Sequence, residues 1–546
     1  MTRDLDALTR DPLDLLVVGG GVHGLFAAYD AAQRGLRVGL VEAADFGGGL
    51  SFNHQRTLHG GLRELERGRL LKARRQIHER RTWAHIAPHL VRPLPFLVGT
   101  YRFTKRSPLV LRAGFRAYDL LGRGRNTGVS PELHLPRARL ESAAATRRLF
   151  PGIDGQRLAG GAVWYDYQAK HPDRLTWTVA LAARDAGAVL ANHARAVAPL
   201  REGAAVAGAR VRDELTGREL DVPARVTLLA AGSALGPLLE AFGASGAPPL
   251  LRAMNLLVDR PARDIATAAR GPSGRTLTAV PWRGFVLVGT HQSTAFVGPD
   301  EPRPPIEAVE AFLSDIQATF RALDVQATDV RLVHHGLVPA TTRRGRAELL
   351  ADTRIIRHAR QGTRGLVSLV GVKYTNARTA AEAAVNAVLA ELGRHAGRCR
   401  TASVPLPYAG IADGEGRLTE ALREHRLDLD RDVREHLTSW YSTEAVAVVT
   451  HAIERQALDR LTDDQPYLTG EFSYAAEHAS ARTLTDAVLR RTPLGSAGHP
   501  GRAALERAAA AMAGPLGWSA EDVAREIAEI ERIYPPNDAL TGRRTL

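Results

Sequence analysis

Three glycines near the start of the chain have the spacing of a loop that binds a dinucleotide. Gly19, Gly21 and Gly24 form the pattern Gly-x-Gly-x-x-Gly directly after an apolar run, and Glu42 follows 18 residues after the last of them. Glycines at this spacing allow a tight turn and let backbone N–H groups approach a diphosphate at the N-terminus of a helix. The Glu42 carboxylate can accept hydrogen bonds from the hydroxyls of an adenosine ribose, and its charge disfavours a 2′-phosphate. The sequence therefore predicts a dinucleotide site, and these residues alone leave FAD and NAD open.

The elements around the glycines must place them at the end of a strand. The sequence predicts an apolar strand over Asp14–Val18, a helix that runs through Ala32, and a second strand over Arg37–Val41. This order is the start of a βαβ unit, whose first turn faces the dinucleotide. Farther along, Val226–Gly232 predicts an apolar strand ending in Ala-Ala-Gly, which can bring Gly232 back to the same site.

Length and composition bound the class of protein. With 546 residues the chain has room for about three domains, and 45% hydrophobic with 24% charged residues is ordinary for globular proteins. The single cysteine, Cys399, excludes a disulfide framework and cysteine-based zinc or iron–sulfur sites, and no metal site is predicted. The first apolar run, Leu15–Val18, is too short for a secretory signal or a membrane span, so we expect a cytoplasmic protein.

The charge of the chain is strongly positive and is carried by arginine. The net charge is +13, and only four of the 72 basic residues are lysines. This bias indicates a GC-rich genome rather than a nucleic-acid interface, since basic residues are not interleaved with aromatic ones. The charge instead favours an anionic substrate, an anionic cofactor or a membrane surface as the partner, and no nucleic acid.

The remaining chain divides into a mixed part and a helical part. A basic helical stretch is expected from Gly61 to about His85, and the prolines at 88, 93 and 95 indicate a boundary after it. The middle of the chain alternates short strands and helices, which predicts mixed α/β structure. After Pro407 the sequence predicts a separate helical domain. Its expected helices are Thr419–Arg426, Thr443–Arg455, Phe472–Arg490 and Ala503–Ala513.

Several segments spread along the chain carry the motifs of one known family. These segments are Asp14–Gly24, Leu58–Arg63, Gly160–Asp166, Pro281-Trp282 with Gly289-Thr290, Gly371–Thr375 and, near the C-terminus, Ala481–Thr492 with Leu494-Gly495 and Leu516–Trp518. They resemble the FAD-dependent glycerol-3-phosphate dehydrogenases of the D-amino-acid-oxidase superfamily. The last group resembles that family's helical C-terminal domain, which generic flavin amine oxidases lack.

The resemblance implies the fold and its division into domains. It implies an α/β fold in which a Rossmann-type FAD-binding domain is joined to a mixed β-sheet substrate domain and an all-helical C-terminal domain. We expect the FAD-binding domain to be discontinuous, over residues 1–90, 155–235 and 331–400. The substrate-binding (cap) domain is expected over residues 91–154 and 236–330, and the helical domain over residues 401–546.

The resemblance also implies a reaction and its residues. In the family a hydride passes from a secondary alcohol carbon to flavin N5, and a quinone or another acceptor such as dioxygen takes up the electrons. The family's catalytic positions correspond to Arg63, Arg354 and Lys373, and Lys373, Thr375 and Ser51 lie among the residues expected near the flavin. Guanidinium groups suit a phosphate because they donate paired hydrogen bonds. An ammonium near flavin N1 and C2=O could stabilise the reduced anionic flavin.

Three departures from the family pattern leave the substrate open. Val338 replaces a phosphate-contacting arginine, Glu64 replaces an aromatic residue, and Asn255 replaces a histidine. The first hypothesis is oxidation of sn-glycerol 3-phosphate to dihydroxyacetone phosphate. The second is an FAD-dependent oxidase or dehydrogenase of a different anionic hydroxy or amino acid, and the third is a catalytically inactive flavin-binding homologue.

Attachment of the flavin and contact with a membrane are two further questions that the resemblance raises. Related dehydrogenases attach FAD through a histidine, and His54 lies about one residue from where that histidine would align. Quinone-reducing relatives sit at the inner face of the cell membrane, so a peripheral contact there is left open as well. The sequence gives no oligomeric state.

Overall fold

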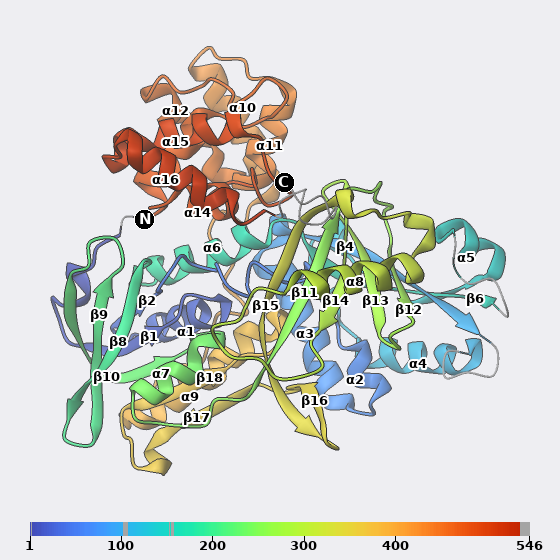
Figure 1. The fold of residues 1–546 in the computed structure, drawn as a ribbon, viewed down its shortest axis with the longest axis horizontal. Coiled ribbons are helices and arrows are strands. Elements are labelled where there is room, and N and C mark those ends of the chain that lie inside the picture. The colour runs from blue at the N-terminus through green and yellow to red at the C-terminus, as the bar shows by residue number, and fades with distance from the viewer. Residues whose placement is uncertain (2, 102–106, 152, 154–157, 535–546) are drawn as a thin grey trace.

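The chain folds around two β-sheets that lie next to each other, with a helical region packed above them (Figure 1). The computed structural model describes residues 1, 3–101, 107–151, 153 and 158–534. The predicted domain boundary at 154/155 and the last part of the predicted helical domain, residues 535–546, lie outside the described residues.

The first sheet is built around parallel strands. In spatial order it runs β17-β18-β10-β1-β2-β7, with parallel pairing throughout except for the antiparallel edge pair β17 and β18. Its strands are β1 (Leu13–Val18), β2 (Val38–Val41), β7 (Val189–Ala191), β10 (Glu219–Leu229), β17 (Arg354–Arg357) and β18 (Leu366–Val370), and an antiparallel ribbon of β8 (Ala194–Glu202) and β9 (Ala205–Asp213) extends β10. Because β1, β2, β10 and β18 are parallel, their carboxyl ends meet at one edge of the sheet.

Both faces of the first sheet are covered, as its continuous apolar strands require. On one face Leu15 and Val17 of β1 pack against three helices, α1 (Val22–Gln33), α6 (Pro172–Asp185) and α9 (Ala377–Leu392). On the other face Leu16 and Val18 pack against the β8–β9 ribbon and α7 (Leu235–Ala241). The βαβ start predicted from the sequence is confirmed.

The second sheet is mostly antiparallel and has ten strands, in the order β16-β15-β11-β14-β13-β12-β4-β6-β3 with β5 paired to β6. The strands are β3 (Thr57–Leu58), β4 (Val91–Tyr101), β5 (Arg139–Ser142), β6 (Leu158–Ala169), β11 (Leu250–Val258), β12 (Ala266–Arg270), β13 (Thr276–Trp282), β14 (Phe285–Gln292), β15 (Val330–Arg343) and β16 (Arg346–Leu349). Only the pairing of β4 with β12 is parallel among the described strands, so this sheet is mixed, as predicted.

Two segments that were predicted to belong to the FAD-binding domain pair with strands of the second sheet. Residues 158–169 form β6 and residues 330–349 form β15 and β16, and all three strands pair in the second sheet. The sequence assigned both segments to the FAD-binding domain, because a strand's partner cannot be read from its own residues. Pro93 and Pro95 also lie inside β4 rather than in a linker, at positions where β4 pairs with β6 and not yet with β12.

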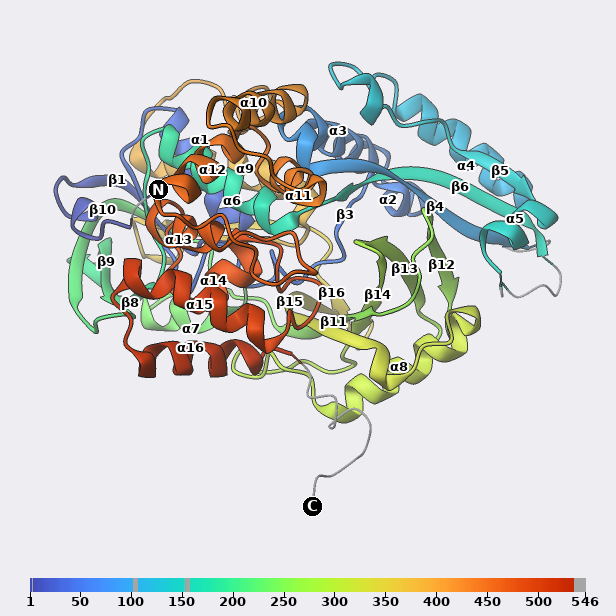
Figure 2. The ribbon, with the colours of Figure 1, turned by 90° about the horizontal axis from the view of Figure 1, so that it is seen from above.

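Helices cover the second sheet on both faces. Leu97 of β4 belongs to the core under α8 (Ile306–Thr319), whereas Val98 packs against Phe115 of α4 (Pro108–Leu121), and Figure 2 shows these two helices on opposite sides. The other helices of this part are α2 (Leu62–Glu66), α3 (Leu70–Ile86) and α5 (Ala143–Leu149). The basic helix expected from Gly61 to about His85 is therefore two helices, which separate at Gly68 with its positive φ of 72°.

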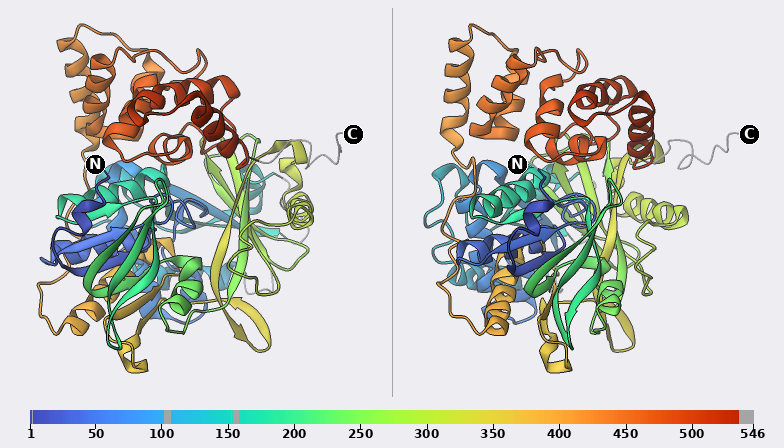
Figure 3. Two further views of the ribbon diagram at one scale, coloured as in Figure 1. Left: turned by 60° about the vertical axis from the view of Figure 1, so that its left-hand side comes forward. Right: turned by 90° about the vertical axis from the view of Figure 1, so that its left-hand side faces the viewer.

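The C-terminal region is helical, as predicted, and stands over both sheets (Figure 3). Its helices are α10 (Ile411–Glu424), α11 (Arg431–Tyr441), α12 (Ala445–Glu454), α13 (Thr469–His478), α14 (Leu484–Asp486), α15 (Arg502–Leu516) and α16 (Ala520–Glu531). The helix predicted over Phe472–Arg490 is interrupted, because Ser480 has a positive φ of 53° and Thr483 caps a new helix. The core of this region is continuous with Trp282 and Leu257 of the second sheet.

Candidate cofactor and substrate site

A cavity of about 650 Å³ opens at the carboxyl edge of the first sheet, and its volume lies within the roughly 300–1,000 Å³ of small-molecule and cofactor sites. Segments that follow the four parallel strands line it: 18–23 after β1, 41–43 after β2, 230–234 after β10 and 371–374 after β18. Asn255, Thr290 and Val338 line it from the second sheet, so the cavity lies between the two sheets.

Glycine is favoured at the three positions of the motif for different structural reasons. A Cβ at Gly19, whose φ is +112°, would lie 2.7 Å from the Ala230 carbonyl oxygen, and a Cβ at Gly24 would lie 1.9 Å from the Gly19 carbonyl oxygen. Both positions therefore require glycine for the turn to form. A Cβ at Gly21 would meet only the Ser51 Oγ, at 3.5 Å, so glycine there keeps part of the cavity open. Gly19 and Gly21 line the cavity, and Gly24 lies behind them.

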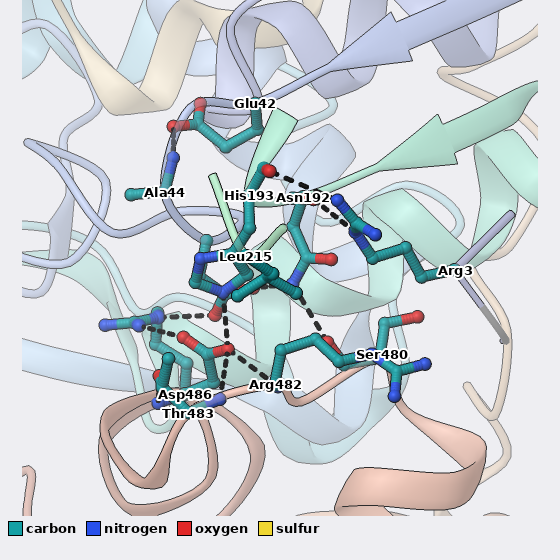
Figure 4. A network of polar contacts seen from close by, with 12 residues as sticks. Arg3, Glu42, Ala44, Asn192, His193, Leu215, Ser480, Arg482, Thr483 and Asp486 are labelled. Atoms are coloured by element: carbon teal, nitrogen blue, oxygen red, sulfur yellow. Dashed lines mark hydrogen bonds and ion pairs between the residues drawn. The ribbon is translucent and has the colours of Figure 1, made fainter. Parts of the chain in front are cut away.

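Glu42 is fixed by two backbone amides at one end of the cavity. Its Oε2 accepts from Gly20 N at 2.6 Å and its Oε1 accepts from Ala44 N at 2.9 Å, and Figure 4 shows the second of these contacts. Burial raises the pKa of the Glu42 carboxyl, and the two amide hydrogen bonds oppose this rise. The carboxylate thus borders the cavity at the place predicted to hold a ribose.

Ser51 and Gly232, which the sequence predicted as cofactor-binding residues, also line the cavity. The Ser51 Oγ accepts from Val22 N at 3.0 Å and so ties the loop before it to the N-terminus of α1. Gly232 follows β10 with a left-handed φ of +57°, which lets the chain turn away from the cavity after the strand.

Across the row of four parallel strands from Glu42, the cavity is lined after β18 by Lys373. Its Nζ donates to Glu64 Oε1 at 2.9 Å. Burial lowers the pKa of Lys373, and the hydrogen bond and charge of Glu64 oppose that shift. The Glu64 side chain is only 2% exposed and does not line the cavity, so it contacts the lysine from behind. Lys373 is thus the predicted site residue that carries a cationic group to this end.

The other predicted site residues lie outside the cavity wall. Arg63 and Arg354 are exposed, and neither guanidinium has a carboxylate within 4.0 Å among the described residues. Thr375 is buried elsewhere: its Oγ1 accepts from His59 N at 3.0 Å and its carbonyl accepts from Trp83 Nε1 at 2.9 Å. Thr375 therefore holds the chain after β3 in place and does not contact the cavity.

Of the three departures, two face the cavity. Val338 and Asn255 line it, and the Asn255 amide is held by Thr290 Oγ1, which donates to Asn255 Oδ1 at 2.9 Å. An apolar side chain and an amide thus stand where the family resemblance expected an arginine and a histidine. Glu64, the third departure, acts only through Lys373.

Two histidines at the cavity are half-buried, and the family resemblance singled out only one of them, His54, as a candidate for flavin attachment. His23 and His54 line it, and the Nε2 of each is buried without a hydrogen-bond partner among the described residues. Burial lowers the pKa of His23 to about 4 and holds the pKa of His54 well below its ordinary value, so both rings are neutral. His54 stacks on Tyr374 with the ring centroids 4.4 Å apart. Their polar atoms fit a ligand with hydrogen-bonding groups.

The conformation of the loop before α2 depends on Asp166, which lies in one of the segments that carry the family resemblance, and on Arg80, which the sequence did not mark. Asp166 Oδ1 accepts from Gly60 N at 2.8 Å, and Asp166 Oδ2 lies 3.1 Å from His59 Nδ1. Arg80 Nη1 donates to the same carboxylate. This explains why the segments Leu58–Arg63 and Gly160–Asp166 occur together: the second fixes the first. These contacts give His59 a structural role in the loop.

Comparison with known proteins identifies FAD as the dinucleotide cofactor. A family model described as "FAD dependent oxidoreductase" matches residues 14–387, which include every segment that lines the cavity. The chain belongs to the FAD-dependent oxidoreductase family. FAD is its cofactor, and the glycine turn, Glu42 and the unpartnered histidines fit that group. A second model, described as "C-terminal domain of alpha-glycerophosphate oxidase", matches residues 399–523.

Individual members of the family match along the whole chain. The glycerol-3-phosphate dehydrogenase of Synechocystis is 26% identical, with 98% of each chain covered. That of Mycobacterium leprae is 32% identical over 95% of this chain and 87% of its own. The structure of the glycerol-3-phosphate dehydrogenase from Bacillus halodurans complexed with FAD is 25% identical and has a TM-score of 0.75, with 98% of this chain and 96% of that chain covered. The resemblance inferred from the motifs is confirmed.

No helix among the described residues is both long enough and apolar enough to cross a bilayer.

Proposed function

We propose that this FAD-dependent oxidoreductase oxidises the secondary alcohol of sn-glycerol 3-phosphate to dihydroxyacetone phosphate. The observation that carries the proposal is the position of Lys373: the cavity runs from the ribose-binding Glu42 past the glycine turn to this ammonium. Since the glycines take the diphosphate, the flavin ring belongs at the Lys373 end. The match of the whole chain, helical region included, to glycerol-3-phosphate dehydrogenases supports the substrate.

When bound, FAD supplies the redox chemistry by taking the hydrogen of the alcohol C–H with two electrons at N5. The chain's residues bind and orient the cofactor and the substrate. Gly21 leaves room for the diphosphate, Glu42 binds the ribose, and Lys373 places a positive charge where negative charge develops. Arg63 and Arg354, without carboxylate partners within 4.0 Å among the described residues, are available for the substrate's phosphate, and the hydroxyl proton leaves to solvent.

The electrons must then leave to an acceptor, for which we propose a quinone. A quinone acceptor would bring the enzyme to the inner face of the cell membrane as a peripheral protein. The positive net charge of +13 would favour contact with anionic lipids there.

A second candidate function is oxidation of another anionic hydroxy or amino acid. Two observations favour it: Val338 lines the cavity in place of an arginine, and Glu64 offsets the charge of Lys373. A pocket with less positive charge binds a phosphate dianion less strongly relative to a monoanionic carboxylate.

Anaerobic titration of the purified holoenzyme decides between these functions. We expect glycerol 3-phosphate to bleach the flavin band in a single phase, with dihydroxyacetone phosphate as the product. Bleaching by other hydroxy or amino acids alone would favour the second candidate. A flavin that is reduced by dithionite but by none of these donors would indicate a catalytically inactive flavin-binding protein and would refute the proposal.

A further inference from the structure

Glu64 is a buried carboxylate surrounded by cations. Besides the 2.9 Å hydrogen bond from Lys373, its Oε1 lies 3.6 Å from Lys72 Nζ, and its Oε2 lies 3.7 Å from the Arg69 guanidinium. Its side chain is 2% exposed. A carboxylate this well buried is stable as an anion only because of these neighbours.

The cations around Glu64 do not depend on it equally. Lys72 Nζ also donates to the Ala351 carbonyl oxygen at 2.8 Å and pairs with Asp352, and Arg69 lies 3.6 Å from the same Asp352. Lys373, in contrast, has Glu64 as its one carboxylate within 4.0 Å among the described residues. Removing Glu64 would therefore leave Lys72 and Arg69 paired but Lys373 unpaired.

The backbone around Glu64 is held from several sides. Glu64 N donates to the Gly61 carbonyl at 2.9 Å, and the Glu64 carbonyl accepts from Arg69 N at 2.9 Å. The turn before it is fixed by Asp166, which binds Gly60 N. A lysine has a flexible four-carbon stem and needs a partner to hold its charge in one place. The fixed carboxylate of α2 is such a partner.

We propose that Glu64 is a positioning residue: it fixes the Lys373 ammonium at the flavin end of the cavity and keeps it protonated at alkaline pH. The proposal rests on the flavin-facing role of Lys373 given above, and it does not depend on the identity of the substrate. Glu64 acts through Lys373 and does not itself line the cavity.

The charges around Lys373 determine whether its pKa rises or falls when the Glu64 charge is removed. Burial and the neighbouring charges of Lys72 and Arg63 lower the pKa of Lys373, and only Glu64 raises it through a direct hydrogen bond. Asp352 and Arg69 complete the set of charged groups in this network. Loss of the Glu64 charge therefore lowers the Lys373 pKa further.

The test is the pH dependence of the midpoint potential of bound FAD, measured by spectroelectrochemistry on the holoenzyme without substrate. The deprotonation of Lys373 produces a break in this dependence, because a neutral amine no longer stabilises the reduced flavin. In Glu64→Gln we expect the break at a lower pH than in the wild type, and Glu64→Asp should restore most of the difference. Asp352→Asn removes an equal charge that does not touch Lys373, and it should move the break much less.

A double variant assigns the break to Lys373. In Glu64→Gln/Lys373→Arg the guanidinium stays charged over the accessible range, so the break should disappear. A break that is unchanged in Glu64→Gln, or one that persists in the double variant, would overturn the proposal. If Glu64→Gln does not retain FAD, the comparison of Glu64→Asp with Asp352→Asn makes the same test. Because no substrate is present, failure of the substrate assignment leaves this result intact.

Discussion

Among single residues, Lys373 is the one whose replacement we expect to affect the proposed reaction most. Only four of the chain's residues are lysines, and this one lines the cavity between β18 and α9. In the proposed reaction its ammonium would stabilise charge that is greater in the transition state than in the ground state, which is the condition for an effect on rate.

We expect Lys373→Met to lower the rate of anaerobic flavin reduction by about 10²- to 10³-fold, the cost of removing one preorganised charge from an active site. Stopped-flow absorbance with saturating glycerol 3-phosphate measures this rate. FAD content should remain near that of the wild type, since the diphosphate and ribose contacts are at the other end of the cavity. Lys373→Arg keeps the charge and should lose less. A rate within threefold of the wild type for Lys373→Met would contradict the assigned role.

The glycines allow a graded prediction about cofactor binding. Gly24→Ala places a Cβ 1.9 Å from the Gly19 carbonyl, so we expect this variant to accumulate little folded protein. Gly21→Val fills space inside the cavity without a backbone clash, so we expect a folded protein with at least about tenfold weaker FAD binding, or about 1.4 kcal/mol. Fluorescence titration of the apoprotein with FAD gives the affinity, and circular dichroism gives the fold. Equal behaviour of the two variants would refute the distinction between turn and cavity.

At this scale the sequence predicted the residues whose role follows from their backbone and missed those whose role follows from orientation. Gly19 and Glu42 lie where their spacing placed them. Thr375, expected at the flavin, turns instead toward His59 and Trp83. The direction of the Glu64 carboxylate depends on how α2 packs against the segment after β18, and no local pattern contains that information.

At the scale of elements, the helical region is joined to the loop that borders the ribose site. Asp486 at the end of α14 accepts from His193 Nε2 at 2.8 Å (Figure 4). His193 N donates to the Ala44 carbonyl at 2.6 Å. Ala44 N in turn binds Glu42. Asp45, in the same loop, is fully buried and pairs with Arg490 and Arg491. The C-terminal region therefore holds the cofactor loop through buried charges.

We expect Asp486→Asn to destabilise the protein by about 3 kcal/mol, because it leaves His193 without a carboxylate and leaves Arg490 with Asp45 as its one remaining carboxylate among the described residues. FAD affinity should fall as well, since the loop that carries Glu42 loses its support. Thermal unfolding followed by flavin fluorescence reports both effects. Asp522→Asn is the matched control: Asp522 forms the same kind of capping box on α16, but its side chain is 30% exposed, so its effect should be much smaller. Equal effects would show that only the cap matters.

The contribution of His193 has a defined pH dependence. Burial opposes its protonation, but the charge of Asp486 outweighs this and raises the pKa of His193 in the folded protein. A raised folded-state pKa gives stability that is complete below the unfolded value of about 6.5 and is lost as the pH rises through the folded-state pKa. The difference in melting temperature between the wild type and His193→Gln should therefore be larger at pH 6 than at pH 9. A difference that grows with pH would contradict the pairing.

Helices and strands were predicted correctly where the pattern that specifies them lies within one continuous segment of the sequence. The βαβ start follows from Asp14–Val18, the glycines and Arg37–Val41, because its strands and helix are adjacent in the sequence. The placement of β6 and β15 in the second sheet depends on partners far along the chain, such as β4 and β11. Local patterns give the existence of such strands but not the sheet they join.

For the whole molecule, the balance of buried titratable groups sets how it responds to acid. Burial lowers the pKa of His23 to about 4 and of His89 to about 3, and it holds the pKa values of His54, His171 and His334 well below their ordinary range. These five side chains lie in the FAD-binding part, in the second sheet and at the contact with the helical region, so the effect is not confined to one domain.

We expect the protein to lose stability steeply as the pH falls below about 6.5. Between the folded and unfolded pKa values the unfolded chain binds protons that the folded chain does not, and each such histidine costs up to about 1.4 kcal/mol per pH unit. Burial raises the pKa of Asp173 to about 6, and it also raises the pKa of Glu42, Glu79 and Glu526. These carboxyls oppose the loss because they gain protons in the folded state first, but the loss begins at higher pH, because the histidines take up protons in the unfolded chain from about pH 6.5. Melting temperatures by circular dichroism between pH 8 and pH 5 test the slope. His89→Gln should reduce the slope by one proton, whereas replacement of the exposed His395 by Gln should leave the slope unchanged. A flat profile in the wild type would mean that the five histidines named above are charged in the folded protein.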